Sequence, residues 1–339
     1  MVIDALGGPG AVDPSEPDDA PLSAPALADV RTSGVTAVNI TVNDVGNGPD
    51  RFEKTIDDIA RWQFEITARP DLFLKVLRAS DLTLAKSSGR MGLIFGFQDT
   101  SMLDGDLKRL GVFHNLGLRI CQPTYNVRNL MGDGCLEPAD AGLSNLGRQF
   151  VGEVNRLHIL LDLSHAGRRT ISEGIEASKA PPAITHTGCR ALADLPRNTD
   201  DSSLKALADK GGVVGIYFMP FLRTSGQPHA EDLALHLEHA VNVCGEDHVG
   251  LGTDGAISGV EINDAFRAYF RKNIEDRRKA GVSAPGESAD VFTLIPEYNE
   301  PLRFLKLADD LVRRGWKPSR VDKILGANFA RLFSEVWFG

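Results

Sequence analysis

Short apolar runs alternate along this chain with segments of helical periodicity, and no other feature restricts its possible folds as much. Eight runs are rich in Val, Ile, Leu and Phe without regular polar alternation, as expected for parallel strands buried on both faces. These runs are residues 2–6, 35–41, 91–97, 117–121, 159–163, 182–185, 212–218 and 248–252. Helical patterns lie between them, for example at 51–66, 144–157, 202–210 and 230–244. The alternation predicts an α/β fold: one (β/α)8 TIM-barrel domain spanning 1–339, with C-terminal helices within 302–336.

Two stretches interrupt the alternation. Residues 8–33 are rich in Pro, Asp, Ala and Ser, which predicts a long loop after the first strand. Residues 256–300 carry a charged helical segment followed by a Pro/Gly/Ser-rich stretch. We interpret this second stretch as an insertion that forms a lid or a dimer contact.

Charge and cysteine usage exclude several classes of protein. The net charge of −9 argues against a nucleic-acid partner, since such proteins usually present a basic surface. No apolar run reaches the roughly 18 residues of a membrane span, and the N-terminus shows no signal-peptide pattern. The four cysteines form no CxxC pair, so we expect a reduced, cytoplasmic setting. We interpret Cys189 as a small buried hydrophobic residue rather than a nucleophile.

Five polar residues directly follow predicted strands: Gln98, Tyr125, His165, His186 and Asp254. The carboxyl ends of all strands meet at one mouth of such a barrel, where its active site lies, so we expect these side chains to converge.

Two histidines that end successive strands are a natural pair of ligands for zinc. Asp254 could then bind metal or take a proton from water. The alternative for either histidine alone is a hydrogen-bonded structural role. The other six histidines fall on helical or strand-entry positions, and we interpret them as surface or packing residues.

Several separated motifs, in order, resemble the membrane (renal) dipeptidase family, peptidase family M19, a branch of the amidohydrolase superfamily. They are DLSHAGRRT, ITHTGCRALADLPRN, GTDG and ILGANFARLF, and the resemblance runs from about residue 34 to the end. It implies an amidohydrolase-like barrel, a homodimer, and dipeptide hydrolysis at a two-zinc centre. It also implies that His165 and His186 hold the second metal, that Asp254 activates water, and that Arg197 contacts the substrate carboxylate. We add Asn126 and Tyr217 as candidate substrate-binding residues.

The sequence departs from this family at three places. Ala5, Leu6, Gly7 and Gly8 stand where the first metal's His-x-Asp pair should follow Asp4. Gln98 replaces the bridging glutamate, and Tyr125 replaces the histidine that polarises the scissile carbonyl. A single zinc on His165 and His186, with Gln98, is therefore expected in place of two, and a site without metal stays open. The Gly7–Gly10 run would either let backbone approach a ligand or form a tight turn.

Three functions follow from these residues. The first is a dipeptidase-like hydrolase of small peptides or amides that uses water activated at a single metal. The second is a metal-independent hydrolase or lyase in the same pocket, with Asp254 and a histidine as acid and base. The third is a non-catalytic protein that binds a small ligand. We expect no nucleic-acid and no membrane partner for any of them.

Overall fold

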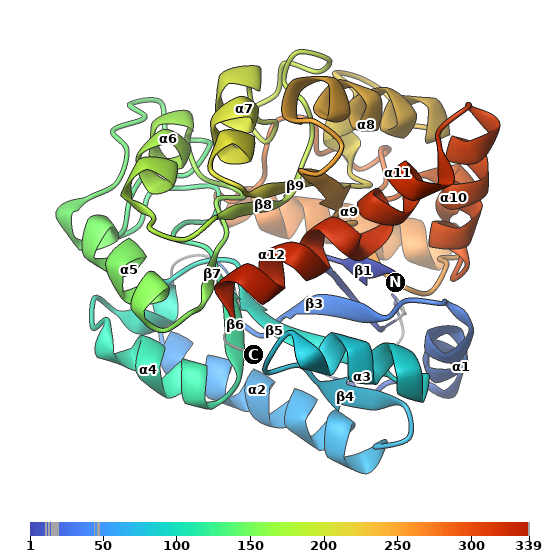
Figure 1. Cartoon of the computed structure of the whole chain (residues 1–339), viewed down its shortest axis with the longest axis horizontal. Helices are drawn as coiled ribbons and strands as arrows, with labels where there is room; N and C mark the ends of the chain where they lie inside the picture. Colours follow the sequence, from blue (N-terminus) through green and yellow to red (C-terminus); the bar gives the residue numbers. More distant parts are fainter. Residues whose placement is uncertain (11, 13, 15–19, 44, 46–47, 338–339) are drawn as a thin grey trace.

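The protein is described here by a computed structural model, which covers residues 1–10, 12, 14, 20–43, 45 and 48–337. Within these residues, eight parallel strands follow one another around a barrel (Figure 1). They are β1 (Ile3–Asp4), β3 (Ala37–Thr41), β5 (Met91–Phe97), β6 (Leu118–Cys121), β7 (Leu160–Leu161), β8 (Ala183–Thr187), β9 (Val213–Ile216) and β10 (Val249–Leu251). Each lies within or overlaps one of the predicted runs. The barrel prediction is confirmed.

Two contacts outside the regular ladders join the sheets into a closed ring. A parallel bridge pairs Asp162, just after β7, with Ala183 of β8. On the other side, the Ala5 N–H donates to the Leu251 carbonyl at 2.9 Å, which links β1 to β10. Closure leaves no free strand edge on the barrel.

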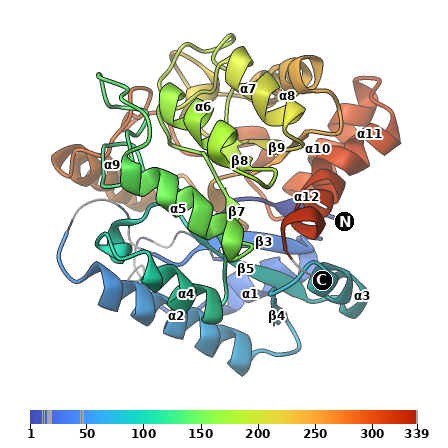
Figure 2. The ribbon, with the colours of Figure 1, turned by 60° about the vertical axis from the view of Figure 1, so that its left-hand side comes forward.

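Helices surround the strands (Figure 2 shows α5 lying beside β7). The helices of the barrel wall are α2 (Arg51–Ala68), α3 (Ser80–Ser88), α4 (Lys108–Asn115), α5 (Asn145–Arg156), α6 (Arg168–Ala177), α7 (Asp201–Asp209) and α8 (Ala230–Cys244). The C-terminal region forms α10 (Arg303–Arg313), α11 (Pro318–Asp322) and α12 (Asn328–Val336), with a π-helical turn, Lys323–Ala327, between the last two. None of the described helices is both long and apolar enough to span a bilayer.

The last helix closes one end of the barrel. Phe329, Phe333 and Trp337 pack with inward-facing apolar side chains of the strands, and all of these are buried. Gly250 of β10 permits this packing, because a Cβ atom there would lie 2.5 Å from the Phe329 ring. Since α12 fills this end, a ligand has to enter from the opposite one.

The prediction of a long loop at 8–33 is wrong in part. Helix α1 (Ala24–Thr32) begins inside it, where the Ser23 hydroxyl caps the helix by accepting from the Ala26 N–H. A proline in the first turn of a helix costs nothing, which is why a Pro-rich composition misled the prediction. Two short strands, β2 (Gly7–Gly8) and β11 (Gly255–Ala256), also pair here in parallel. A further short strand, β4 (Phe73–Lys75), pairs with β5.

The interruption at 256–300 contains the expected charged helix, α9 (Asp264–Lys279). Its apolar face forms a small separate cluster of Phe266, Phe270, Ile274 and Phe292. The segment is therefore folded on its own apolar contacts beside the barrel.

Candidate functional site

A cavity of about 880 Å³ opens at the carboxyl ends of the strands. Gln98, Tyr125 and Asp254, three of the predicted site residues, line it. Arg277 and Glu287 of the 256–300 segment line it too, so this segment forms part of the cavity wall. Sequence reasoning missed both residues, because nothing in a charged helix marks one arginine as facing a cavity.

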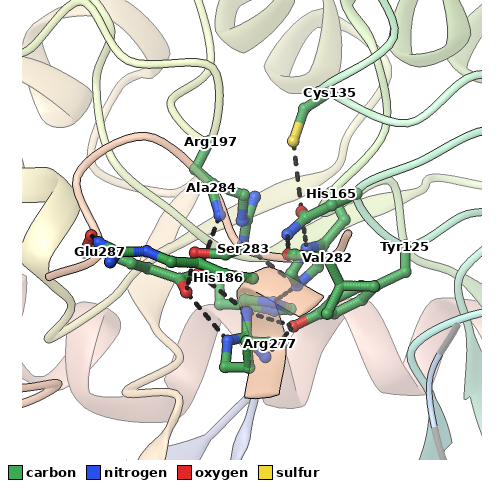
Figure 3. Close-up of polar contacts among 12 residues, drawn as sticks. Tyr125, Cys135, His165, His186, Arg197, Arg277, Val282, Ser283, Ala284 and Glu287 are labelled. Atoms are coloured by element: carbon green, nitrogen blue, oxygen red, sulfur yellow. Dashed lines mark hydrogen bonds and ion pairs between the residues drawn. The ribbon is translucent and has the colours of Figure 1, made fainter. Parts of the chain in front are cut away.

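The two predicted metal-binding histidines lie against each other. The Nε2 atoms of His165 and His186 are 2.8 Å apart, and both side chains are buried (Figure 3). The Tyr125 ring stacks on the His165 imidazole with 4.1 Å between ring centres. Three side chains from the ends of three strands thus converge as predicted.

The hydrogen bonds of Asn126 fix the tautomer of His165. The Asn126 amide nitrogen donates to the Val282 carbonyl at 2.8 Å, which turns its Oδ1 toward His165. That oxygen lies 2.7 Å from His165 Nδ1. An amide oxygen can only accept, so Nδ1 carries the proton and Nε2 keeps its lone pair. Asn126 is itself buried, and its observed contacts orient His165.

A second chain of hydrogen bonds fixes His186. The Thr185 hydroxyl donates to the Asp162 carboxylate at 2.6 Å and lies 2.8 Å from His186 Nδ1. Ser164 also donates its hydroxyl proton to Asp162. The Thr185 oxygen therefore accepts from His186 Nδ1, and the Nε2 lone pair of His186 is free as well. Nothing in the sequence pattern pointed to Thr185 or Asp162 as supports.

Two neutral imidazoles consequently face each other through Nε2 atoms that lie 2.8 Å apart. Burial and the Arg197 cation hold the pKa values of both His165 and His186 well below the usual range, so neither is a stable imidazolium. An Nδ1–H bonded to an oxygen acceptor behind Nε2 is the arrangement of a metal-binding histidine, although Nε2 of His165 here accepts a hydrogen bond from Arg197. A cation bound by both nitrogens would have to displace the Arg197 N–H from His165.

Arg197 lies beside the pair and is almost fully buried. Its Nη2 donates to His165 Nε2 at 3.2 Å. Arg197 and His165 line a smaller cavity of about 310 Å³, while Tyr125, whose ring stacks on His165, lines the larger one. Tyr217 is fully buried beneath the guanidinium and donates its hydroxyl to Asn198. The observed contacts of Tyr217 are thus with Asn198 and Arg197.

Tyr125 is held from the side of the 256–300 segment. Both terminal nitrogens of Arg277 lie 3.4 Å from the Tyr125 hydroxyl. Glu287 binds Arg277 through two hydrogen bonds, of 2.8 and 3.0 Å. Burial raises the pKa of Tyr125, an effect that the Arg277 cation opposes. The phenol therefore stays protonated and can donate a hydrogen bond.

Asp254 follows β10 in a left-handed backbone conformation, with φ of 57°. Its N–H donates to the Leu6 carbonyl at 2.8 Å, which fixes the turn against the first strand. Burial raises the pKa of its carboxyl to about 6, against the opposing effects of Arg197 and Arg277. A carboxyl with this pKa can accept and return a proton near neutral pH.

Residues 5–10, which directly follow the first strand and are all described, include no His, Cys, Asp or Glu. Gly7 and Gly8 form β2, and a Cβ atom at Gly7 would lie 2.5 Å from the Asp4 carboxylate. The close approach that glycine permits at position 7 is thus to the protein's own Asp4 side chain. At Gly8 a Cβ would meet no atom within 4 Å.

This site has fewer potential metal ligands among its described residues than the two-zinc centre that the family resemblance implied. No three His, Cys, Asp or Glu side chains among the described residues are grouped so that they could hold a metal ion. The Gln98 amide nitrogen donates to Thr41, and no contact joins it to the histidines in the described part of the chain. Among the described residues, the two histidines are the donors that lie together, a smaller set than a two-zinc centre of the family type requires.

The other histidine and cysteine interpretations agree with the structure. His236 is buried, accepts from the Cys189 N–H at 2.8 Å and bonds the Leu222 carbonyl at 3.0 Å. Burial raises the pKa of the Cys189 thiol, which leaves it unreactive. Both residues are part of the packing.

A protein-family model matches residues 23–266; its family is described as membrane dipeptidase (peptidase family M19). An amidohydrolase from Pseudomonas aeruginosa is similar over the whole chain, with 32% identity, a TM-score of 0.83, and coverage of 100% of this chain and 97% of that one. A dipeptidase of Schizosaccharomyces pombe is 32% identical over 190 residues, 53% of this chain and 46% of its own.

A metallo peptidase from Rhodobacter sphaeroides, solved with a phosphinate mimic of the dipeptide L-Ala-D-Ala, shares the fold. Its TM-score is 0.76 at 21% identity, with 92% of this chain and 90% of that chain covered. The chain spans about half the length of the curated dipeptidases it matches.

Proposed function

This chain belongs to the membrane dipeptidase family of hydrolases, and from that premise we propose that it hydrolyses an amide bond in a small peptide or related amide. The observation that carries the proposal is Asp254. Its carboxyl has a pKa of about 6 and lines the same cavity as the Tyr125 hydroxyl. Attack of water on a carbonyl needs a base that takes the water proton and a hydrogen-bond donor that stabilises the carbonyl oxygen, and this cavity holds both.

Each proposed role follows from the chemistry of its group. Asp254 takes a proton from the attacking water and returns it to the leaving nitrogen when the C–N bond breaks. Tyr125 donates its hydroxyl to the carbonyl oxygen, where negative charge develops. Arg197 binds the substrate carboxylate with its planar fork, and Tyr217 supports Arg197 from below. Asn126 orients His165.

We propose that one zinc ion per chain is held by His165 and His186, with Gln98 as a candidate weak ligand. When bound, such an ion would polarise water or the carbonyl and lower the barrier to attack. The support is the approach of the two imidazoles, whose Nδ1–H groups are bonded to oxygens and whose Nε2 atoms lie 2.8 Å apart. A bound cation would relieve the repulsion between them.

The substrate is proposed to lack the free amino group of an ordinary dipeptide. In the described part of the cavity wall, Glu287 is occupied by Arg277, and Asp254 is assigned to proton transfer. The N-blocked or N-methylated peptides, other small amides and lactones fit this pattern. We further propose that residues 256–300 act as a lid, and that the protein is a cytoplasmic homodimer. Light scattering after size-exclusion chromatography measures the molar mass in solution and so tests the proposed homodimer.

The test is a hydrolysis assay with zinc-loaded protein on a panel of dipeptides, N-acetyl and N-methyl peptides, and a lactone, with products detected by mass spectrometry. Asp254→Asn should lower the rate on the responding substrate by about 100-fold or more. Tyr125→Phe should lower it by roughly 100-fold. Asp264→Asn, which removes an exposed carboxylate at the start of α9, is the matched control.

Hydrolysis of no member of the panel would contradict the proposal. Activity that chelators leave unchanged would instead favour the metal-independent hydrolase or lyase. A ligand that raises the melting temperature and is recovered unaltered would favour the binding protein.

A further inference from the structure

A buried arginine with an unused pair of donors lies in the wall of the larger cavity. Arg303 begins α10 and is only 7% exposed. Its Nε donates to the Glu300 carbonyl at 2.9 Å, and its Nη2 to the carbonyls of Ile257 and Ser258 at 2.8 and 3.3 Å. Its Nη1 has no hydrogen-bond partner among the described residues, and no described carboxylate forms an ion pair with it.

Ser258, which lines the same cavity, carries a second unused donor. Its Oγ is buried and has no partner within the described part of the chain. The two groups are neighbours, since the Ser258 carbonyl accepts from Arg303. Buried donors are nearly always hydrogen-bonded, and each one left without a partner is costly. The Ser258 hydroxyl, on a residue whose carbonyl accepts from Arg303, therefore indicates a ligand that brings an acceptor.

The position of Arg303 is next to the proposed base. A Cβ atom on Gly255, the residue after Asp254, would lie 3.9 Å from Arg303 Nη1. A group bound at this nitrogen would therefore sit close to the turn that carries Asp254.

The charges around Arg303 leave room for an anion. The acidic groups that act on it are Asp4, Glu300 and Asp29. Asp4 is bonded to Thr253, and burial raises its pKa to about 7. Glu300 is paired with Lys306 at 2.7 Å. A guanidinium and a hydroxyl together match the two oxygens of a carboxylate.

We infer that Arg303 and Ser258 form a binding subsite for a carboxylate of the substrate, in addition to the carboxylate assigned to Arg197. The inference deepens the proposed function and rests on it for the substrate class: a small amide with a second anionic group near the scissile bond. It also gives a reason for the missing ammonium anchor, since a cationic amino group would be repelled by Arg303.

The test compares two isosteric ligands, N-succinyl-L-alanine and N-succinamoyl-L-alanine, which differ only in a terminal carboxylate or amide. Calorimetric titration of the full chain, in an Asp254→Asn background that stops turnover, gives both Kd values. The carboxylate should bind about 10-fold or more tightly, as expected for a charge-assisted hydrogen bond. Arg303→Gln should abolish this preference, and Ser258→Ala should reduce it by roughly threefold.

Arg61→Gln is the matched control, because it removes one positive charge from the same cavity at α2 and should leave the preference unchanged. Ser258→Ala keeps all three carbonyl contacts of Arg303. If Arg303→Gln does not fold, the ligand preference of Ser258→Ala therefore tests the subsite. Equal Kd values for the two ligands would overturn the inference. So would a preference that survives in folded Arg303→Gln and in Ser258→Ala.

The assay separates this inference from the proposed function, because it measures binding and needs no turnover. If the protein hydrolyses neutral amides but binds the two ligands equally well, the subsite is overturned and the hydrolase proposal stands. Failure to hydrolyse any amide, with the preference intact, would overturn the hydrolase proposal and leave the subsite standing.

Discussion

His165 and Asp254 both adopt left-handed backbone conformations, with φ of 64° and 57°. Non-glycine residues rarely do so, and such strain gathers at functional positions. In each case a main-chain hydrogen bond fixes the turn: Cys135 N–H to the His165 carbonyl at 2.8 Å, and Asp254 N–H to the Leu6 carbonyl. The geometry holds both side chains at the carboxyl ends of their strands.

The pKa of Asp254 predicts the acid limb of the activity profile. A general base works only when deprotonated, so kcat/KM should rise with pH and level off above about 6. Initial rates between pH 4.5 and 8 measure this limb. A limb that stays near pH 4 would mean that Asp254 is not the group that titrates.

Asp4 predicts a pH dependence of stability. Burial raises its pKa from 3.8 to about 7 in the folded protein, so the folded state binds the proton more tightly than the unfolded state. The resulting stabilisation of the folded state is fully present below pH 3.8 and is lost as the pH rises through 7. Its full size is on the order of 4 kcal/mol.

Asp4→Asn should remove that loss. The free energy of unfolding, measured in urea at pH 4 to 8, should fall less steeply with pH in the variant than in the wild type. Parallel curves would show that Asp4 does not carry the effect.

The sequence predicted which strand ends carry polar groups, because that follows from the apolar runs alone. It could not predict the partners of those groups. Thr185 and Asp162 support His186 through hydrogen bonds that depend on side-chain rotamers, and Asn126 does the same for His165. Gln98 was placed with the histidines from the family pattern, whereas its amide bonds Thr41.

At the scale of elements, α9 connects the 256–300 segment to the cavity. Its Arg277 is clamped by Glu287, whose carboxylate also accepts from the Ser283 hydroxyl and the Ala284 N–H. Glu287 is 5% exposed and Arg277 is 26% exposed. The pair fixes the side chain that bonds Tyr125.

Glu287→Gln should therefore affect both stability and activity. It leaves a mostly buried guanidinium without its counterion, which should lower the free energy of unfolding by about 2–3 kcal/mol, somewhat less than for a fully buried pair. It should also lower kcat/KM, because Tyr125 loses its fixed neighbour. Asp276→Asn, in the exposed Lys272–Asp276 pair of the same helix, should leave both unchanged. Equal effects from the two variants would contradict the role given to the clamp.

The helices and strands that the sequence pattern did not predict are short, and their residues show no clear helical or strand periodicity. Helix α1 is nine residues long and lies in a Pro-rich stretch, and β2 and β11 are two residues each. The pairing of β2 with β11 depends on the closure of the barrel, which brings together residues about 250 positions apart. Such long-range pairing leaves no periodic pattern in the sequence.

For the molecule as a whole, closure of the barrel brings these strand ends together. Helix α12 seals one end, so the polar residues of all strands share the other. The eight predicted strands were sufficient to locate the open, carboxyl-terminal end of the barrel. The family motifs then supplied the candidate site residues at that end. The proposed zinc site is a property of the assembled barrel, since His165 and His186 come together only when their strands lie side by side.

Metal content is the most direct test of the account. Protein made without a histidine tag, incubated with zinc and dialysed, should contain one zinc per chain by mass spectrometry. The His165→Ala, His186→Ala double variant should contain none, and a His229→Ala, His239→Ala double variant should keep one. No zinc in the wild type, two per chain, or zinc retained in the His165/His186 variant would contradict the single-metal site.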